Sequence, residues 1–510
     1  MKKIILLVLN LFFGITTVSA QSIDEYFERI RHDEAALISF MSKMPKGGDL
    51  HHHYSGSVYT ESLIQKAIKD DYFLNVQTMV AKRADKEFEN LPNPQILHKE
   101  DKGKTIKDYS FPNTKTIAAK RVYDESKGWK KLSVLREEGK LNEYKLKMLK
   151  QWSIQYFNPV VPSDKHFFDS FGKFREVVND YTAEGLLEFK ERAIKENVSY
   201  IETQFKEVQV NLDLSDFKNE NGKLLSLASK KDTSAIFKIF DKIHNSIIKQ
   251  NALEKVAEFN SKFIKKPHDS LKIDSDDFTM RYQNYVLRFM PPVDVFKNLI
   301  LASISDETSD LIVGVNIVAP EHGEISMRDY WLHMLMFNYC QKKYAKANYA
   351  LHAGELTLGL VKPEELTSHI NDAVYLANAD RIGHATGMPY EFNSSELLQY
   401  MAENKIPVEV NLTSNAFILN VEKDEHPILL FKDYGVPVVI STDDAGILRT
   451  NLTDQFVTLA KNYPSFHYAD IKECVYNSLE FSFINADKKK CLLKDLDKRF
   501  IEFEKSVLEK

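Results

Sequence analysis

The chain has 510 residues, of which 43% are hydrophobic, and a formal net charge of −5 at pH 7. The hydrophobic fraction excludes a disordered chain, and the weak acidic balance gives no sign of a nucleic-acid-binding surface. Three cysteines and no Cys-x-x-Cys pair exclude a disulfide-rich scaffold and a zinc site built from paired thiolates. A metal site would need histidine and carboxylate ligands. At most one disulfide can form, and Cys474 with Cys491 is the pair that the sequence favours for it; two buried thiols are an equally open alternative.

The first twenty residues are predicted to be a signal peptide. Lys2 and Lys3 precede the apolar run 4–13, and Val18-Ser19-Ala20 supplies small residues before a cleavage point. The apolar run is shorter than the roughly 20 residues that a membrane span requires. We therefore expect a secreted or periplasmic protein without a membrane span.

The mature chain is predicted to begin with an N-terminal helical segment, residues 21–44, because apolar residues recur at helical spacing over 24–43. A turn then leads into a first strand that contains three consecutive histidines. His51 and His53 share one face of that strand because side chains alternate along it. Two imidazoles on one face can bind one cation; a chance cluster is the alternative.

Two insertions are predicted next. Residues from about 70 to 165 are rich in lysine and have sparse apolar positions, which favours a solvated surface over a lid or an interaction module. After a second strand, residues from about 210 to 275 form a helical insertion. The remaining chain alternates long amphipathic helices with short apolar runs.

Eight short strands result, and they predict an α/β fold, a (β/α)8 TIM-type barrel over residues 45–510 with helical insertions after strands 1 and 2. The carboxyl ends of all strands in such a barrel face one mouth, where the active site lies. The predicted strands begin near Asp49 and Val198 and then cover 282–289, 311–318, 349–352, 381–384, 407–412 and 436–441.

Polar residues gather where these strands end. In the stretch Asn348 to Thr357, His352 and Glu355 follow a short apolar run, and Gly354 lets the backbone turn closely. The alternative for this pair is a satisfied hydrogen bond. Asp443 and Asp444 end the eighth strand, and their side chains diverge, so that one can bind metal while the other faces a substrate; a helix cap is the alternative. The other strand ends carry His51/His53, Glu202/Gln204, Glu321/His322, His384 and Asn411/Ser414/Asn415.

Five stretches together resemble the adenosine deaminase family, a metal-dependent amidohydrolase-type barrel. They are MPKGGDLHHHYSG, LHAGE, RIGHATGM, VEVNLTSN and VISTDD, in that order between residues 44 and 444. The chain is most similar to the secreted branch, the adenosine deaminase-related growth factors, in its signal peptide, its MPKG lead-in and its long insertion after the first strand.

The resemblance implies a zinc-dependent hydrolase that converts adenosine or 2′-deoxyadenosine to inosine and ammonia. It implies that Glu355 donates a proton to the purine N1, that His384 orients or deprotonates the attacking water, and that Asp444 hydrogen-bonds the purine N7 and the attacking hydroxide. A cation at the site would lower the pKa of the water toward 7. One zinc ion per chain would be held by His51, His53, His352 and Asp443, with substrate contacts from His53, Ala319 and Asp444.

Three positions depart from the family's pattern. Ala319 stands where a glycine amide commonly meets the purine, Ser55 where a ribose-contacting aspartate often occurs, and Ala445 where proline usually follows the aspartate pair. An alanine amide can still donate a hydrogen bond. These departures leave the chemistry intact but widen the choice of purine or nucleoside.

The alternatives are a deaminase of another aminopurine or a pterin on the same metal residues, and a non-catalytic growth-factor-like binding protein. Loss of a ligand or of the glutamate would mark the binding protein, and neither is lost. The cytidine-deaminase type of zinc site is excluded because it needs a Cys-x-x-Cys pair. We expect a small purine nucleoside as the partner, with no nucleic acid, and a homodimer stays open.

Overall fold

The computed structural model describes residues 22–83 and 125–509. The predicted signal peptide, residues 1–20, and the centre of the first predicted insertion lie outside these ranges. Within the described ranges, every helix is too short or too polar to cross a membrane.

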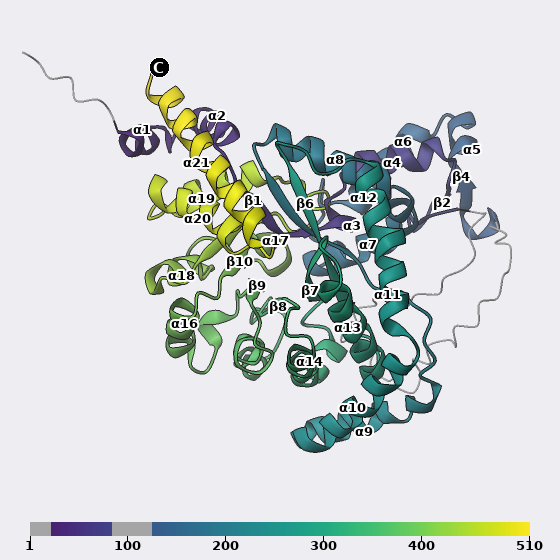
Figure 1. Ribbon diagram of the computed structural model, residues 1–510. Coiled ribbons are helices and arrows are strands. Elements are labelled where there is room, and N and C mark those ends of the chain that lie inside the picture. The colour runs from purple at the N-terminus through teal and green to yellow at the C-terminus, as the bar shows by residue number, and fades with distance from the viewer. Residues whose placement is uncertain (1–21, 84–124, 510) are drawn as a thin grey trace, which may run out of the picture.

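Eight parallel strands form the centre of the molecule (Figure 1). They make two four-stranded sheets, in the orders β1-β5-β6-β7 and β8-β9-β10-β11. Single residue pairs bridge the two seams, His52 with Asp443 and Val315 with Tyr349. The α/β barrel prediction is confirmed, although continuous ladders do not close the barrel. The strands are β1 (Gly48–His53), β5 (Tyr200–Lys206), β6 (Thr279–Leu287), β7 (Ile312–Val318), β8 (Ala350–Ala353), β9 (Arg381–His384), β10 (Val408–Val410) and β11 (Val438–Ile440).

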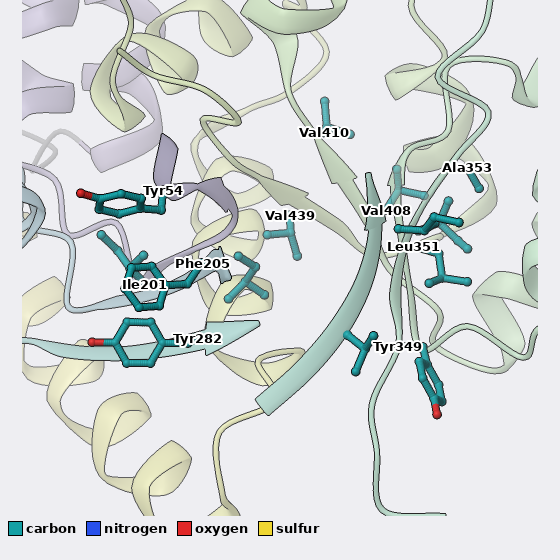
Figure 2. Close-up of a cluster of buried hydrophobic side chains, with 14 of the residues drawn as sticks. Tyr54, Ile201, Phe205, Tyr282, Tyr349, Leu351, Ala353, Val408, Val410 and Val439 are labelled. Carbon is teal, nitrogen blue, oxygen red and sulfur yellow. The ribbon is translucent and has the colours of Figure 1, made fainter. Parts of the chain in front are cut away.

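Strand alternation separates an apolar face from a polar one. Figure 2 shows Leu351 and Ala353 of β8 and Val408 and Val410 of β10 among the buried apolar side chains. The residues between them, such as His352 of β8, lie on the opposite face because successive side chains alternate. The apolar face packs against the surrounding helices, and the polar face supplies the site.

Amphipathic helices cover the strands, as the sequence pattern predicts. The helix between β6 and β7 is buried along most of its length and packs against both strands. The covering helices are α7 (Ser163–Asp180), α8 (Thr182–Lys195), α13 (Pro292–Glu307), α14 (Glu324–Lys343), α16 (Ser394–Glu403), α17 (Leu412–Leu419), α18 (Ile428–Tyr434), α19 (Leu452–Asn462), α20 (Tyr468–Glu480) and α21 (Ala486–Leu508).

The single helix predicted over 24–43 is wrong, because two helices, α1 (Ile23–Ile30) and α2 (Glu34–Lys43), occupy that stretch. The first helix ends at Ile30, and Asp33 begins the second by accepting a hydrogen bond from the amide of Ala36. Arg31, in the break, is buried and donates to the carbonyls of Ala460 and Phe466. The N-terminal helices thus pack beside α20 and α21 (Figure 1).

The described part of the first insertion is more ordered than its sequence suggests. Its short strands, β2 (Phe73–Asn75), β3 (Ala81–Lys82) and β4 (Trp129–Lys131), form an antiparallel sheet. Trp152, in α6 (Leu141–Trp152), is buried and donates to the carbonyl of Met79 at 2.8 Å. The insertion therefore packs on α4 (Thr60–Lys69) and α7, with α5 (Leu132–Glu137) beside it.

The second insertion is helical, as predicted. Phe240 of its longest helix stacks on Phe296 of α13 with ring centroids 4.1 Å apart. This contact fixes the insertion against the barrel, and Figure 1 shows α9 and α10 at the edge of the molecule near α14. The helices are α9 (Glu220–Ser229), α10 (Thr233–Lys249), α11 (Ala252–Asn260), a π-helical turn (Ser261–Lys265) and α12 (Lys266–Ser270).

The disulfide that the sequence left open between Cys474 and Cys491 does not form, and all three cysteines are free. Cys474 is buried in α20, whereas Cys491 is exposed on α21. The alternative of two buried thiols is therefore also wrong for Cys491. Its neighbour Leu492 takes the buried face of α21, and adjacent helical residues point in different directions.

Candidate metal centre and active site

The four predicted metal ligands meet at the carboxyl ends of β1, β8 and β11. The Nε2 atom of His53 lies 3.3 Å from Nε2 of His51 and 3.2 Å from Oδ1 of Asp443. The ring of His352 lies with its centroid 4.5 Å from that of His51. The donor atoms of His51, His53 and Asp443 lie close enough together to share one ion, and His352 is close enough to share one with His51 and His384.

The backbone at the β1–β11 seam brings these ligands together. The amide of Asp443 donates to the carbonyl of His51, and the amide of His53 donates to the carbonyl of Asp443. Asp443 then leaves the strand with φ at +60°, and His384 leaves β9 with φ at +69°. Positive φ is uncommon for residues other than glycine and recurs at functional sites.

Oxygen acceptors hold two of the imidazoles from behind. Nδ1 of His51 lies 2.7 Å from Oε2 of Glu409, and Nδ1 of His352 lies 2.8 Å from Oδ1 of Asn316. The Asn316 oxygen also accepts the backbone amides of Ile317 and His352, so its identity as an acceptor is fixed. With protons on Nδ1, both rings direct their Nε2 lone pairs toward the cluster.

The electrostatics suit a metal. Burial lowers the pKa of His53 to about 4 and that of His352 well below its usual range. Burial alone would raise the pKa of Asp443, but the neighbouring histidines lower it to about 2. His51 differs: burial opposes protonation, but the hydrogen bond and charge of Glu409 raise its pKa. Three imidazoles and a carboxylate are a donor set that fits zinc or a similar divalent cation.

A buried ionic network stands behind His51, and sequence reasoning did not find it. Arg381 donates at 2.6 Å to both Glu202 and Glu409. Glu202 also accepts the hydroxyl of Tyr200. The one signal in the sequence is a charged residue, Glu409, between two valines of a buried strand. Because Arg381 is shared, Glu409 keeps its charge and its position against His51.

Glu409→Gln should weaken metal binding by about 10- to 100-fold while the fold persists, because loss of a second-sphere partner of a ligating histidine typically costs that much. Chelator competition against the loaded protein measures the change. Glu403→Gln, an exposed position at the end of α16, is the matched control. An unchanged dissociation constant for Glu409→Gln would remove the carboxylate from the metal site.

A tight turn positions Glu355 after the ligand His352. Glu321 accepts the amides of Gly354 and Glu355 at 3.0 and 3.1 Å and pairs with His369. Gly354 has φ at +70°, and a Cβ there would lie 2.6 Å from Ile370. The turn therefore needs glycine, and it places Oε1 of Glu355 3.8 Å from Nε2 of His384.

The two carboxyl groups beside the metal cluster, Glu355 and Asp444, both have raised pKa values, which favours their protonated forms. Burial raises the pKa of Glu355 well above its usual range, and the charge of Asp443 adds to the effect. Burial and the same neighbour raise the pKa of Asp444. Oδ1 of Asp444 has no hydrogen-bond partner in the described part of the chain. The helix-cap alternative for this aspartate pair is wrong, because Asn451 caps the following helix, α19.

Gly56 makes room for Asp444, since a Cβ at Gly56 would lie 1.7 Å from Oδ1 of that aspartate. We predict that Gly56→Ala displaces Asp444, keeps the metal and lowers kcat/KM by about 10²-fold, a typical cost of misplacing a reacting group. Gly222→Ala, where an added Cβ meets nothing within 4 Å, is the control. Near-normal kinetics for Gly56→Ala would show that Asp444 tolerates movement.

A cavity of about 410 Å³ opens onto this centre. His53, His352, Glu355, His384, Asp443 and Asp444 line its floor, and Ala319 and Ser55 line it as well. Ala319 has φ at +89°, which explains why glycine is common at its position in the resembling family. One face of α7 forms a wall with Phe167, Phe168, Phe171 and Phe174.

Two other residues predicted at strand ends, His322 and Gln204, lie outside the set of candidate metal ligands. His322 lies 3.2 Å from Asp164 of α7, away from the metal cluster. Gln204 lies 3.2 Å from Nε2 of His53 and lines the cavity. Of the predicted strand-end residues, Gln204 therefore reaches the site and His322 ties a wall helix to the barrel.

Fold and site together define a parallel α/β barrel with a histidine–aspartate centre at its carboxyl-terminal mouth. Residues 278–499, less than half of the chain, match the family model described as adenosine deaminase. The segment contains β6 to β11 and most of the site, while β1, with His51 and His53, precedes it.

Known deaminases are similar to parts of this chain in sequence or in fold. An adenosine deaminase of Clostridium kluyveri is 32% identical over 203 residues, which cover 38% of this chain and 54% of that protein. An aminodeoxyfutalosine deaminase of Streptomyces coelicolor is 37% identical over 111 residues, 22% of this chain and 26% of that protein. The matches thus span about half or less of these relatives. A crystal structure of an Arabidopsis N6-mAMP deaminase has the same fold (TM-score 0.52, 16% identity, 90% of this chain and 99% of that one).

Proposed function

We propose that the protein is a zinc-dependent deaminase that hydrolyses adenosine or 2′-deoxyadenosine to the inosine product and ammonia. The observation that carries this proposal is one cavity that brings three candidate metal ligands, His53, His352 and Asp443, together with two buried carboxyl groups, Glu355 and Asp444, whose pKa values burial raises. The adenosine deaminases among the relatives support the same reaction.

Each residue of the site has a separate role in the proposed reaction. A cation held by His51, His53, His352 and Asp443 would activate water for attack near neutral pH. Glu355, kept protonated by burial, donates to the purine N1 and makes C6 electrophilic. Asp444, also protonated, donates to the purine N7. His384 faces the gap between Glu355 and Asp443 and orients the attacking water.

The cellular setting belongs to the same proposal. We assign the signal-peptide pattern of residues 1–20 to export, which makes the enzyme secreted or periplasmic. Export and the long insertion after the first strand support grouping it with the growth-factor branch of the family. A homodimer is part of the proposal, and light scattering on the purified protein tests it.

A larger nucleoside is the second candidate substrate, because the cavity extends beyond the metal centre along the phenylalanine face of α7. Arg175 and Lys206 line this part. Burial lowers the pKa of both side chains. Two partly buried cations beside aromatic rings favour an aminopurine nucleoside with an anionic or aromatic extension, and the Streptomyces relative deaminates a compound other than adenosine by its name.

A panel of substrates tests the proposal. Purified, zinc-loaded protein is given adenosine, 2′-deoxyadenosine, adenosine 5′-monophosphate, adenine and an aminopterin, and the loss of absorbance near the adenine maximum is followed. Adenosine or 2′-deoxyadenosine should give the highest kcat/KM. Preference for an extended nucleoside would select the second candidate, and no turnover of any compound would leave the binding-protein alternative.

A further inference from the structure

His384 lies in the same cluster as His51 and His352, but the hydrogen bond at its Nδ1 atom has the opposite direction. Its Nδ1 lies 2.8 Å from the amide nitrogen of Asn415, whereas oxygen atoms face Nδ1 of the other two rings. By distance alone, His384 could join His51 and His352 as a metal ligand. Whether it can bind a metal through Nε2 depends on which ring nitrogen carries the proton.

A chain of hydrogen bonds fixes where that proton lies, and it starts from a backbone donor. The amide of Ile428 donates to Nδ1 of His426 at 3.1 Å, so the neutral ring of His426 carries its proton on Nε2. Burial lowers the pKa of His426 to about 3, which keeps the ring neutral. Nε2 of His426 therefore donates to Oδ1 of Asn415 at 3.0 Å.

The direction of the Asn415 amide follows from this. With its oxygen turned to His426, its nitrogen must face His384 and donate to Nδ1. A ring nitrogen that accepts a hydrogen bond carries no proton, so Nδ1 of His384 is unprotonated. A neutral ring that accepts at Nδ1 carries its proton on Nε2.

We propose that Asn415 and His426 are positioning residues that lock His384 in the tautomer with the proton on Nε2, which makes His384 a hydrogen-bond donor to the reacting oxygen and excludes it as a metal ligand. The relay runs from the start of α18 through α17 to the end of β9. The inference rests on the proposed deaminase function only for what the reacting oxygen is.

The geometry around Nε2 fits a donor. Nε2 lies 3.8 Å from Oε1 of Glu355 and 3.9 Å from Oδ2 of Asp443, beyond direct hydrogen-bond distance from either. Separations of this size leave room for one bridging oxygen. A proton on Nε2 would hold that oxygen with a lone pair directed away from His384. His384 therefore orients the attacking water and does not remove its first proton, which narrows the two roles that the family resemblance implied.

The tautomer can be read directly, without turnover. In protein labelled with ¹⁵N at histidine, and with His384 assigned by comparison with His384→Gln, Nδ1 should show a pyridine-type resonance and Nε2 a pyrrole-type resonance. Zinc-loaded protein should give the same pattern. A pyrrole-type Nδ1 in the wild type, or a zinc-shifted Nε2, would overturn the proposal whether or not the protein deaminates adenosine.

Variants test the relay itself. Asn415→Asp replaces the amide donor with an acceptor and should reverse the His384 tautomer. Metal content and Tm should hold, while kcat falls by at least about 10²-fold and KM changes little; a wrong histidine tautomer can cost about 10⁴-fold in kcat where geometry is intact. His426→Phe should lower kcat less, and His426→Gln, whose amide can still donate, should recover part of the loss.

The control is His268→Phe, a buried histidine that bonds to Tyr282 outside the cavity. Near-normal kcat in Asn415→Asp, or a loss of kcat that follows a matching loss of metal and Tm, would reduce the relay to a packing role. Absence of turnover in the wild type would instead reject the proposed function, and the resonances of Nδ1 and Nε2 would still decide the tautomer.

Discussion

Glu355→Gln is expected to lower kcat by at least about three orders of magnitude while the metal, the fold and KM change little. Glutamine keeps the shape of the side chain and removes the proton. General acid catalysis typically contributes about 10²- to 10⁴-fold, and a group that also makes the ring electrophilic belongs near the top of that range. The lost interaction exists in the transition state, so the effect falls on kcat.

Steady-state kinetics measure kcat and KM of Glu355→Gln, and metal analysis of the same preparation measures its metal content. Glu364→Gln, an exposed glutamate a short distance along the chain, is the control and should behave as wild type. The amides that Glu321 accepts hold the turn independently of the Glu355 side chain, so the variant should fold. Turnover close to wild type would show that Glu355 is structural, and another acid would have to supply the proton.

His352→Ala is expected to remove the bound metal. The ring is buried, its Nδ1 is satisfied by Asn316, and its Nε2 lone pair faces the cluster. Loss of one of the four ligands should lower metal content from about one ion per chain to a small fraction of that, and activity with it. His467→Ala, an exposed histidine, is the control for loss of an imidazole.

Elemental analysis after dialysis against a weak chelator measures the occupancy. Full occupancy in His352→Ala would contradict the assignment of this residue, and the triad with His384 would have to be reconsidered. Addition of zinc to the variant should restore little activity, because the empty ligand position cannot orient the ion.

Much of the site could be predicted from sequence, because barrel chemistry collects at strand ends. His352 and Glu355 surround a glycine with positive φ, and Asp443 and Asp444 end a strand; local pattern predicted these positions, and the family resemblance supplied the role of each residue. All eight strands lie within a few residues of their predicted positions. The largest shift is in β6, which begins at Thr279, three residues before the predicted start.

The parts that sequence could not give depend on contacts between distant residues. Asn415, His426 and Ile428 act on His384 only because a helix and a loop pack behind β9. The network of Arg381 with Glu202 joins residues 179 positions apart. A charged residue in a buried strand, such as Glu409, indicates that it has a hydrogen-bond or ionic partner, but the sequence does not identify which residue that partner is.

The most direct measurement is the stoichiometry of products from adenosine with and without the metal. Zinc-loaded protein should release ammonia and inosine in equal amounts, chelation should abolish both, and restored zinc should recover them. Sustained turnover after complete metal removal would contradict the metal-centred mechanism, and loaded protein that releases no ammonia from any aminopurine would contradict the assignment as a deaminase.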